Sequence, residues 1–493
     1  MNKNEKIFLA IIVLVAIFLC FYRLGDTQLL IQDTARDTLK ILTLWQNKSI
    51  TLIGPPASFS LNSIKEFYFG SFPYYLAMLG LIITGFNPTG ATVPTIIIFI
   101  FSIPVFYLFL KNIRASGFVC FLGTILYVVS PLTVTHMRFF WNPNTIIPLS
   151  VFYWYLATLN NKTRVFEIGF LAGLVAAVIF NFHYFMVIPM VVWGIITIFK
   201  KEWDKSLGNI FGFLLGTIPL FLFELKHEYY LTNSLIYNFS HKATSITVEP
   251  VVFLGRLGEV FMTILGIKSG EIYFGTLFNL SKPWYLMIGL LILFLLICTI
   301  YKIRKHSYWL LLLPLAATII FAARFSDTRL YSRYIFGGLP LIIWIIAEMF
   351  SQKYLRYILI PILVLILYSN FKILTFTPSI SSGYVPLKIV EKIADKIIAD
   401  KPEGKYNLSE NIFGDAQALG LRYFIQRDAK IKPQNVDGYG WLNTLYVVSP
   451  SLEKIKSDNR WEFYASAPWN EPIVENFGEV NLYKFQKPRT DRD

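Results

Sequence analysis

A short polar segment beside the first apolar run carries the residue types from which a reaction could be built. Asp33-Thr34-Ala35-Arg36-Asp37 follows the apolar run that ends near residue 22. Ionisable groups close to membrane hydrocarbon are costly, so an acid and a base there are expected to be functional. A positioned carboxylate can accept the proton that a hydroxyl or amine loses as it attacks, and a guanidinium offers forked donors to phosphate oxygens. We therefore expect Asp33 to be a general base and Arg36 to contact a phosphate leaving group.

Helical spacing would place the charges of this segment on one face. The positions i, i+3, i+4 and i+7 are occupied by Asp33, Arg36, Asp37 and Lys40. The other side carries Ala35, Leu39 and Leu42. The pattern predicts an amphipathic helix at the membrane surface, with its carboxylates turned toward water or a cavity. The alternative interpretation is a solvated helix face with a local ion pair.

Composition places these residues in a membrane protein. The chain has 493 residues, of which 55% are hydrophobic and 17% aromatic, and apolar runs of membrane-spanning length recur through its first three quarters. The net charge of +14 is attributed to cytoplasmic loops and anionic lipid headgroups, and no nucleic-acid partner is expected. Cys20, Cys120 and Cys298 lie inside apolar runs, which indicates neither a disulfide nor a thiolate metal site. No glycine-rich nucleotide loop, zinc spacing or Ser/His/Asp signature is present.

Basic clusters between the apolar runs set the expected topology. They lie near residues 111–114, 162–164, 200–205, 302–305 and 353–356. All of them share the side of the amino terminus if the run at 73–86, which is broken by Pro73 and Gly80, does not cross the membrane. This predicts a polytopic α-helical protein of about eleven transmembrane helices with a cytoplasmic amino terminus. The loop 23–91, the turn 136–144, the loop 224–282, the turn 324–333 and everything after 370 then lie outside.

The carboxyl-terminal part changes in character. Residues 386–400 have helical spacing, with Ile389, Ile393 and Ile397 on one stripe, and residues 442–448 and 480–485 alternate like strands. We expect residues 1–370 to form the membrane-embedded domain and residues 371–493 a small extracytoplasmic α/β domain.

The outer segments supply further candidate residues, each with a structural alternative. Candidates for contact with a donor or its phosphate are Lys65, Tyr68, Arg138, Arg329 and Arg333. Candidates for contact with a sugar or an acceptor are Asp37, Asn142, Asn144, His183, Glu224 and His227. The aromatic residues near Tyr68 also suit an interfacial belt, and the asparagines suit helix caps. His183, Glu224 and His227 also suit interfacial or solvated helix ends.

In order and spacing, the motifs of this chain resemble the GT-C fold glycosyltransferases of family 39 and its relatives, which include protein O-mannosyltransferases and aminoarabinose transferases acting on lipid A. The family's outer loop commonly has Asp-Glu-Ala-Arg, where this chain has Thr34 in place of the glutamate. The other similar segments are Gly54-Pro55-Pro56, Tyr68-Phe69-Gly70 with Tyr74-Tyr75, Arg138 with Trp141 to Asn144, Phe182-His183-Tyr184, and Phe223 to His227. This chain has Gly70-Ser71 where some relatives carry Lys-Pro, so the donor-phosphate role of that lysine is not transferred. It has Asn142 where others carry an aspartate, so no role for a second carboxylate is transferred either.

The resemblance implies transfer of a hexose (such as mannose) or a pentose from a polyprenyl-phosphate donor on the extracytoplasmic face of the plasma membrane. The anomeric carbon would be inverted, with Asp33 as base and Arg36 as donor-phosphate contact. The acceptor could be a protein, a lipid or a cell-wall polymer. No cofactor or obligatory metal is predicted, although Asp33 and Asp37 could in principle hold a divalent ion. The alternatives are a non-enzymatic transporter or flippase of lipid-linked sugars and a binding scaffold, and both predict that Asp33 is dispensable.

Overall fold

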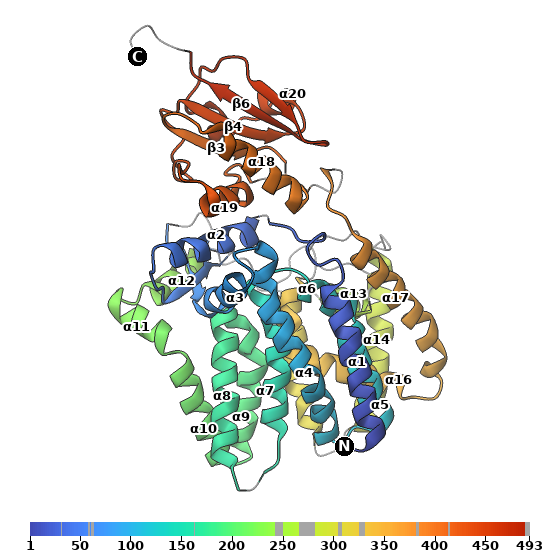
Figure 1. Ribbon diagram of the computed structural model, residues 1–493. Helices are drawn as coiled ribbons and strands as arrows, with labels where there is room; N and C mark the ends of the chain where they lie inside the picture. The colour runs from blue at the N-terminus through green and yellow to red at the C-terminus, as the bar shows by residue number, and fades with distance from the viewer. Residues whose placement is uncertain are drawn as a thin grey trace. The chain divides into compact units, whose positions relative to one another are not determined.

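The chain folds into two compact units (Figure 1). The computed structural model describes residues 1–30, 32–57, 60, 64–161, 163–241, 250–265, 282–303, 308–324, 331–380, 384–412 and 415–488. The membrane unit comprises Met1–Tyr22, Thr51–Leu76 and Thr92–Thr375, and the second unit comprises Arg23–Ile50, Ala77–Ala91 and Phe376–Asp493.

The membrane unit is a helical bundle with a short hairpin. Its first half contains α1 (Lys3–Phe21), β1 (Ile53–Pro56), β2 (Tyr68–Gly70), the start of α3 (Phe72–Ile83), α4 (Val93–Asn112), α5 (Gly117–Val129), α6 (Pro131–Met137), η3 (Asn142–Thr145), α7 (Ile146–Thr158) and α8 (Val165–Phe182). It continues with η4 (Tyr184–Val187), α9 (Ile188–Phe199), α10 (Trp203–Gly216), α11 (Ile218–Lys226), α12 (Tyr230–His241), α13 (Pro250–Ile264) and α14 (Lys282–Ile303). The last elements are η5 (Trp309–Leu311), α15 (Leu312–Arg324), η6 (Ser332–Gly338), α16 (Leu339–Phe350), η7 (Leu355–Ile358) and α17 (Leu359–Thr375).

Several of these helices are long and apolar enough to cross a bilayer. Within the described ranges there are 5 such helices, or up to 7 if two bent helix pairs, α5 with α6 and α10 with α11, each count as one span. Shorter apolar helices, including Tyr184–Phe199 and Trp309–Arg324, lie between them. The protein is therefore built as a multi-pass membrane protein, and the total of about eleven spans remains a prediction.

The described residues of the basic clusters gather at one end of the membrane unit, which we call the basic end. Lys111 Nζ lies 2.9 Å from Glu5 Oε1, so the end of α4 meets the start of α1. Lys302 Nζ donates to Ser351 Oγ at 2.8 Å, and the Arg356 guanidinium stacks on Phe118 at 4.6 Å. Because α1 and α4 are antiparallel, the chain between them starts and finishes at the opposite end. The 12 residues of α3 are about 18 Å long, too short to span the hydrocarbon core, as the sequence predicted.

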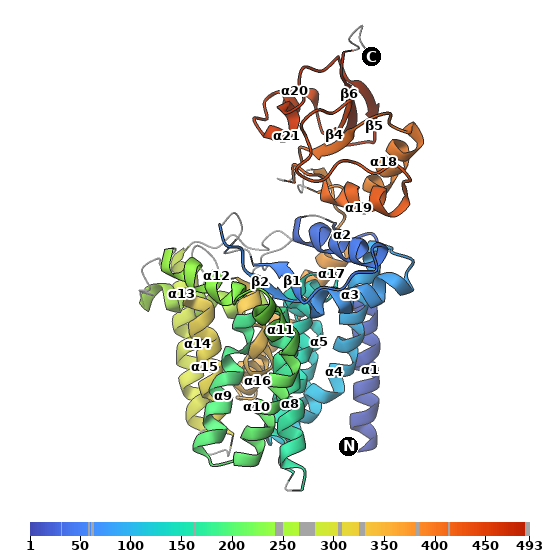
Figure 2. The same ribbon diagram turned by 90° about the vertical axis from the view of Figure 1, so that its left-hand side faces the viewer.

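Glycines hold α8 and α10 in direct backbone contact. The two helices run side by side in both views (Figures 1 and 2). A Cβ atom at Gly173 would lie 2.0 Å from the carbonyl oxygen of Asn209, and one at Gly212 would lie 2.0 Å from that of Phe170. In each helix the contacting glycines are four residues apart, as Gly169 and Gly173 are in α8. Small residues at this spacing let membrane helices approach closely and gain van der Waals contact.

The second unit contains a four-stranded sheet covered by helices. Its elements are α2 (Gln32–Gln46), α18 (Leu387–Asp400), β3 (Tyr406–Glu410), α19 (Leu419–Asp428), β4 (Thr444–Ser449), α20 (Leu452–Lys456), α21 (Trp461–Tyr464), β5 (Ile473–Asn476) and β6 (Asn481–Gln486). The strand order is β3-β4-β6-β5, in which only β3 and β4 are parallel. The expected helix at 386–400 is α18, and the two expected strands are β4 and β6.

One expectation from the sequence requires correction. The sequence analysis placed the apolar side of the Asp33 helix on the membrane surface. In the structure, Ala35 and Leu42 of α2 are buried in one core with Leu421 and Phe424 of α19. The helix therefore belongs to the same folding unit as the carboxyl-terminal sheet, because its apolar stripe is covered by protein.

We predict that Gly173→Ala destabilises the membrane unit. The added methyl group collides with the backbone of α10, and such overpacking typically lowers the free energy of unfolding by about 1–3 kcal/mol. Thermal unfolding of the full-length protein in detergent measures the effect. Gly194→Ala in α9 is the matched control, because a Cβ atom there would meet nothing within 4 Å. Equal melting temperatures for the two variants would contradict the close contact of α8 with α10.

Candidate functional site

The acidic segment of α2 forms a three-residue ion cluster in the second unit. Arg36 Nη1 donates to Asp33 Oδ1 at 2.7 Å, and Arg36 Nε donates to Asp37 Oδ1 at 2.9 Å. Asp33 keeps 44% of its side-chain surface exposed, whereas Asp37 keeps 1%. The two carboxylates thus have different environments although they lie one helical turn apart.

This arrangement leaves Asp33 suited to proton transfer. Arg36 holds one of its oxygens, and no donor within the described ranges reaches the other. The half-exposed carboxylate is therefore oriented and still open to a nucleophile, the geometry that a general base needs. Arg36 is held between two acids, which indicates that it positions Asp33. The sequence expected Asp37 to face water or a cavity as well. It is instead buried and anchors Arg36.

In the membrane unit, three turns that the sequence singled out pack together at the end opposite the basic end. They are the turn from α6 to η3, the turn from α8 to η4, and η6. We call this the polar-turn end. His136 Nδ1 lies 2.9 Å from Asn144 Oδ1, and His136 Nε2 lies 3.3 Å from Ser332 Oγ. All three side chains are buried, so this chain of hydrogen bonds ties the turns to one another.

Arg333 is held over aromatic rings at the polar-turn end. Its guanidinium carbon lies 5.5 Å from the centroid of Trp141, 4.7 Å from that of Tyr331 and 5.2 Å from that of Tyr334. Stacking of this kind fixes the plane of the guanidinium. The sequence analysis identified Arg333 but not its aromatic partners. Tyr331 and Tyr334 lie within two residues of Arg333 in the sequence, and this spacing was the available signal.

Two other residues that were predicted to contact the donor or the sugar hydrogen-bond to the ends of helices. Arg138 Nη1 donates to the carbonyl of Leu19 at 2.7 Å, and its Nη2 donates to that of Tyr22 at 2.9 Å. Asn142 Nδ2 donates to the carbonyl of Phe182 at 2.9 Å. These side chains satisfy the terminal carbonyls of α1 and α8, which have no partner within their own helices. The asparagine thus caps the end of α8, whereas the sequence interpretation placed asparagine caps at the start of α7.

His183 is buried beside these turns. Its ring packs on Phe69 with a centroid separation of 4.7 Å, and no hydrogen-bond partner for its Nδ1 lies in the described part of the chain. Burial, with a further contribution from the charge of Arg333, lowers the pKa of His183 to about 3. The imidazole is therefore neutral at physiological pH and does not serve as a charged ligand there.

The hairpin of the first loop covers the polar-turn end with aromatic side chains. A Cβ atom at Gly54 would lie 2.0 Å from the carbonyl oxygen of Gly70, which explains the glycine in Gly54-Pro55-Pro56. Tyr68 donates to Glu66 Oε2 at 2.5 Å, and burial together with this carboxylate raises its pKa. Tyr68 is thus a neutral hydrogen-bonding group. The Lys65 ammonium lies 6.0 Å from the ring of Tyr237.

An apolar pocket of about 360 Å³ adjoins the hairpin. Its walls include Phe67, Phe180 and Leu220, and Glu224 is the acid in its lining. Glu224 accepts from the backbone N–H groups of Leu231 at 2.7 Å and Thr232 at 3.1 Å, so it caps the start of α12. His227 stacks on Phe223 at 4.3 Å at an exposed helix end.

Most predicted site residues of the membrane unit thus gather around the polar-turn end and the hairpin. Arg329 lies outside the described residues. His136 and Trp141 were missed as site residues, because nothing in their local sequence shows that distant turns bring them together. In the ranges that the structure describes, no three His, Cys, Asp or Glu side chains converge as metal ligands, and independence from metal remains a prediction.

The whole chain has the fold of a solved membrane protein. No protein-family model and no curated protein matches the sequence. ArnT from Cupriavidus metallidurans bound to undecaprenyl phosphate superposes with a TM-score of 0.60 at 9% identity, over 98% of this chain and 99% of that one. Its apo state gives a TM-score of 0.60 at 10% identity, over 99% and 100%. The chain therefore shares the GT-C fold that the sequence resemblance implied.

We predict that His183 makes the protein lose stability on mild acidification. Its native pKa lies below its ordinary value of 6.5, so between these values the unfolded chain binds a proton that the folded chain does not. Linkage then removes about 2 kcal/mol of stability between pH 7 and pH 5. His183→Gln should shrink the difference in melting temperature between these pH values. His227→Gln is the control, and an equal change in that variant would show that the effect does not come from the buried ring.

Proposed function

We propose that this protein is a membrane glycosyltransferase that moves a hexose or pentose from a polyprenyl-phosphate donor to an acceptor outside the cytosol. The observation that carries the proposal is the match of nearly the whole chain to ArnT, a protein solved with undecaprenyl phosphate bound. The presence of an oriented, half-exposed carboxylate in the Asp33 segment supports an enzyme over a transporter or a scaffold.

Asp33 is assigned the role of general base. Transfer with inversion requires one displacement at the anomeric carbon, in which the acceptor oxygen or nitrogen forms the new bond as the phosphate leaves with its electron pair. The attacking group loses its proton in this step, and the free oxygen of Asp33 accepts it. Arg36 contributes by holding Asp33 in one orientation, and Asp37 by holding Arg36. The leaving group is a polyprenyl phosphate, whose low basicity removes the need for a general acid.

Arg333 is assigned to the donor phosphate. Its guanidinium is held by three aromatic rings, and a fixed fork of N–H groups matches phosphate oxygens. The apolar pocket beside the hairpin suits isoprenoid carbons, because its lining is almost entirely aromatic and aliphatic. Arg138 and Asn142 are given structural roles, since their donors already serve helix ends.

We predict that Asp33→Asn strongly slows turnover and leaves donor binding intact. The substitution preserves size and removes the basic oxygen, so the rate should fall by about 10²- to 10⁴-fold. Purified protein in lipid is incubated with a panel of radiolabelled polyprenyl-phosphate sugars, and both sugar release and donor retention are measured.

Asp26→Asn is the matched control for this experiment. Asp26 lies in the same unit, is 38% exposed and pairs with Lys388 at 2.7 Å, so its loss removes a similar carboxylate away from the cluster. Equal turnover by the Asp33 variant and wild type would assign the base to another residue. Binding without turnover by any of the proteins would favour the transporter or scaffold.

We predict that Arg333→Gln weakens donor binding about 10- to 100-fold, because a hydrogen bond to a charged phosphate is worth about 1.5–3 kcal/mol. KM for the donor should rise more than kcat falls. Arg356→Gln is the control, since this arginine also stacks on an aromatic ring but lies at the basic end. A pure loss of kcat in the Arg333 variant would contradict a donor-binding role.

A further inference from the structure

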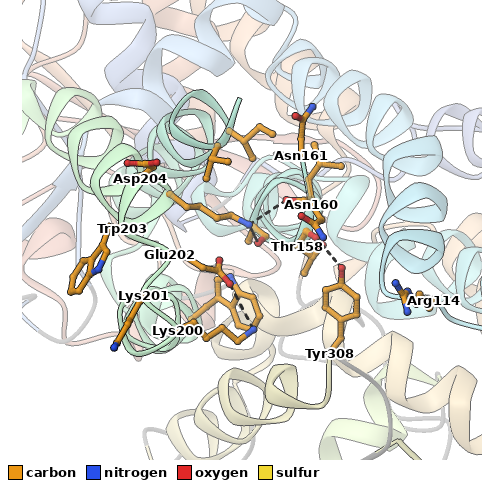
Figure 3. Close-up of a pocket in the computed structure, with 16 residues that line it drawn as sticks. Arg114, Thr158, Asn160, Asn161, Lys200, Lys201, Glu202, Trp203, Asp204 and Tyr308 are labelled. Atoms are coloured by element: carbon orange, nitrogen blue, oxygen red, sulfur yellow. Dashed lines mark hydrogen bonds and ion pairs between the residues drawn. The ribbon is translucent and has the colours of Figure 1, made fainter. Parts of the chain in front are cut away.

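A cavity at the basic end of the membrane unit has cations in its lining that serve helix packing. It measures about 500 Å³ (Figure 3). Lys205 Nζ donates to the carbonyl of Ala157 at 2.5 Å and is held there by backbone. Arg114 and Lys201 lie at opposite edges of the cavity in Figure 3, so one anion cannot meet both. The lining of a smaller cavity in the second unit is different.

This smaller cavity lies on one face of the four-stranded sheet. Alternate residues of a strand point to opposite faces. Tyr446 and Val448 of β4 are buried in one core with α18 and α19. Leu445 and Val447 of the same strand pack with α20 and α21, which lie on the other side of the sheet (Figure 2). These two helices have only 5 and 4 residues, and part of that face remains open as a cavity of about 240 Å³.

Most of the cavity lining is carbon surface. The strands contribute apolar side chains, and α21 with the segment after it contributes Tyr464 and Trp469. The Tyr464 hydroxyl donates to the carbonyl of Lys456 at 3.1 Å, and Trp469 Nε1 donates to that of Phe463 at 3.3 Å. These bonds orient both rings and use their polar atoms, so the rings offer only carbon to a ligand. A cavity of this volume holds one ring-sized group.

The cavity lining also contains polar side chains of both charges. Lys456, Asn470 and Glu471 line it, and all three are exposed. Neither the Lys456 ammonium nor the Glu471 carboxylate forms an ion pair or a hydrogen bond with a residue that the structure describes. The backbone N–H of Asn470 donates to the carbonyl of Gln486 at 2.9 Å, which fixes this residue against β6. The cavity therefore offers a cation, a carboxylate and an amide, and its charges cancel.

Exposed tryptophans lie next to this cavity. Trp461 is 54% exposed and lies three residues before Tyr464 on α21, so the two side chains share one helix face. Trp441 is 83% exposed, and the Lys487 ammonium lies 5.7 Å from its ring. The carbonyl of Lys487 in turn accepts from Asn470 Nδ2 at 3.5 Å. Exposed apolar surface that gathers in one place on a folded domain indicates an interaction site.

The chemistry of the lining selects the ligand. An apolar side chain of a peptide suits the floor but makes no use of the two unpaired charges. A phosphate would be repelled by Glu471, and a cation by Lys456. A sugar ring matches both parts, because its C–H groups suit aromatic rings and each of its hydroxyls both donates and accepts hydrogen bonds.

We propose that this cavity binds one ring of a neutral saccharide. The C–H groups of the ring pack on Tyr464 and Trp469, and its hydroxyls exchange hydrogen bonds with Lys456, Asn470 and Glu471. Binding here needs neither a lipid-linked donor nor turnover, so it is independent of the proposed transfer reaction. The second unit then has a binding function in addition to carrying Asp33.

The test uses full-length protein in lipid nanodiscs, because sugar-based detergents would compete. Saturation-transfer NMR measures binding of the methyl glycosides of glucose, galactose, mannose, N-acetylglucosamine and arabinose. We expect binding with saturation of ring C–H protons. Glu471→Ala should weaken it about 10- to 100-fold, the loss expected for a hydrogen bond to a charged group. Glu453→Ala removes an exposed acid of α20 that does not line the cavity, and it should change affinity less than about twofold.

A second pair of variants tests the aromatic contact. Tyr464→Ala removes the ring and should weaken binding about 2- to 10-fold, whereas Tyr464→Phe keeps the ring and should bind like wild type. Equal losses in these two variants would contradict packing of the sugar on the ring.

Three results would overturn the proposal. Equal binding by wild type and Glu471→Ala would place the sugar at another site. Binding of N-acetylphenylalanine amide but of none of the glycosides would assign the cavity to a peptide side chain. Absence of saturation transfer to every glycoside would exclude a saccharide site.

Discussion

Helix ends inside a membrane protein must find hydrogen-bond partners without bulk water, and this requirement organises the membrane unit. Arg138 holds the terminal carbonyls of α1, and Asn142 holds that of Phe182 at the end of α8. His136 bridges Asn144 and Ser332. Because these partners come from turns far apart in sequence, satisfying them draws three turns into one polar end. Arg333 and its aromatic rings take their places on this framework.

The opposite end follows from a different constraint, the close approach of α8 and α10. Glycines remove the side chains that would separate the two backbones, so the helices lie parallel with their starts together. Parallel helix dipoles placed side by side repel one another. Each start carries an acid in its first turn, Glu167 in α8 and Asp204 in α10, which offsets this repulsion. The same packing contact thus accounts for the stability of the bundle and for the electrostatics of its basic end.

The proposed chemistry depends on the contrast between two acids of one helix. Asp37 is buried and its oxygen holds Arg36, which in turn orients the half-exposed Asp33. Burial of the apolar side of α2 against α19 fixes the helix within the second unit. The carboxyl-terminal sheet and helices therefore have a defined structural task, which is to hold the element that carries Asp33.

The sequence alone determined the membrane class, the polar segments and the sharing of one end by the basic clusters, because hydropathy, charge bias and helical spacing are local properties. It also singled out Asp33, Arg36 and Arg333 as candidate site residues, and their roles stay predictions. The tertiary structure decided which candidates already serve helix ends, as Arg138, Asn142 and Glu224 do, because their partners lie up to 119 residues away. It also decided that protein, and not lipid, covers the apolar side of α2. An amphipathic stripe reports that a face is buried but carries no information about what buries it.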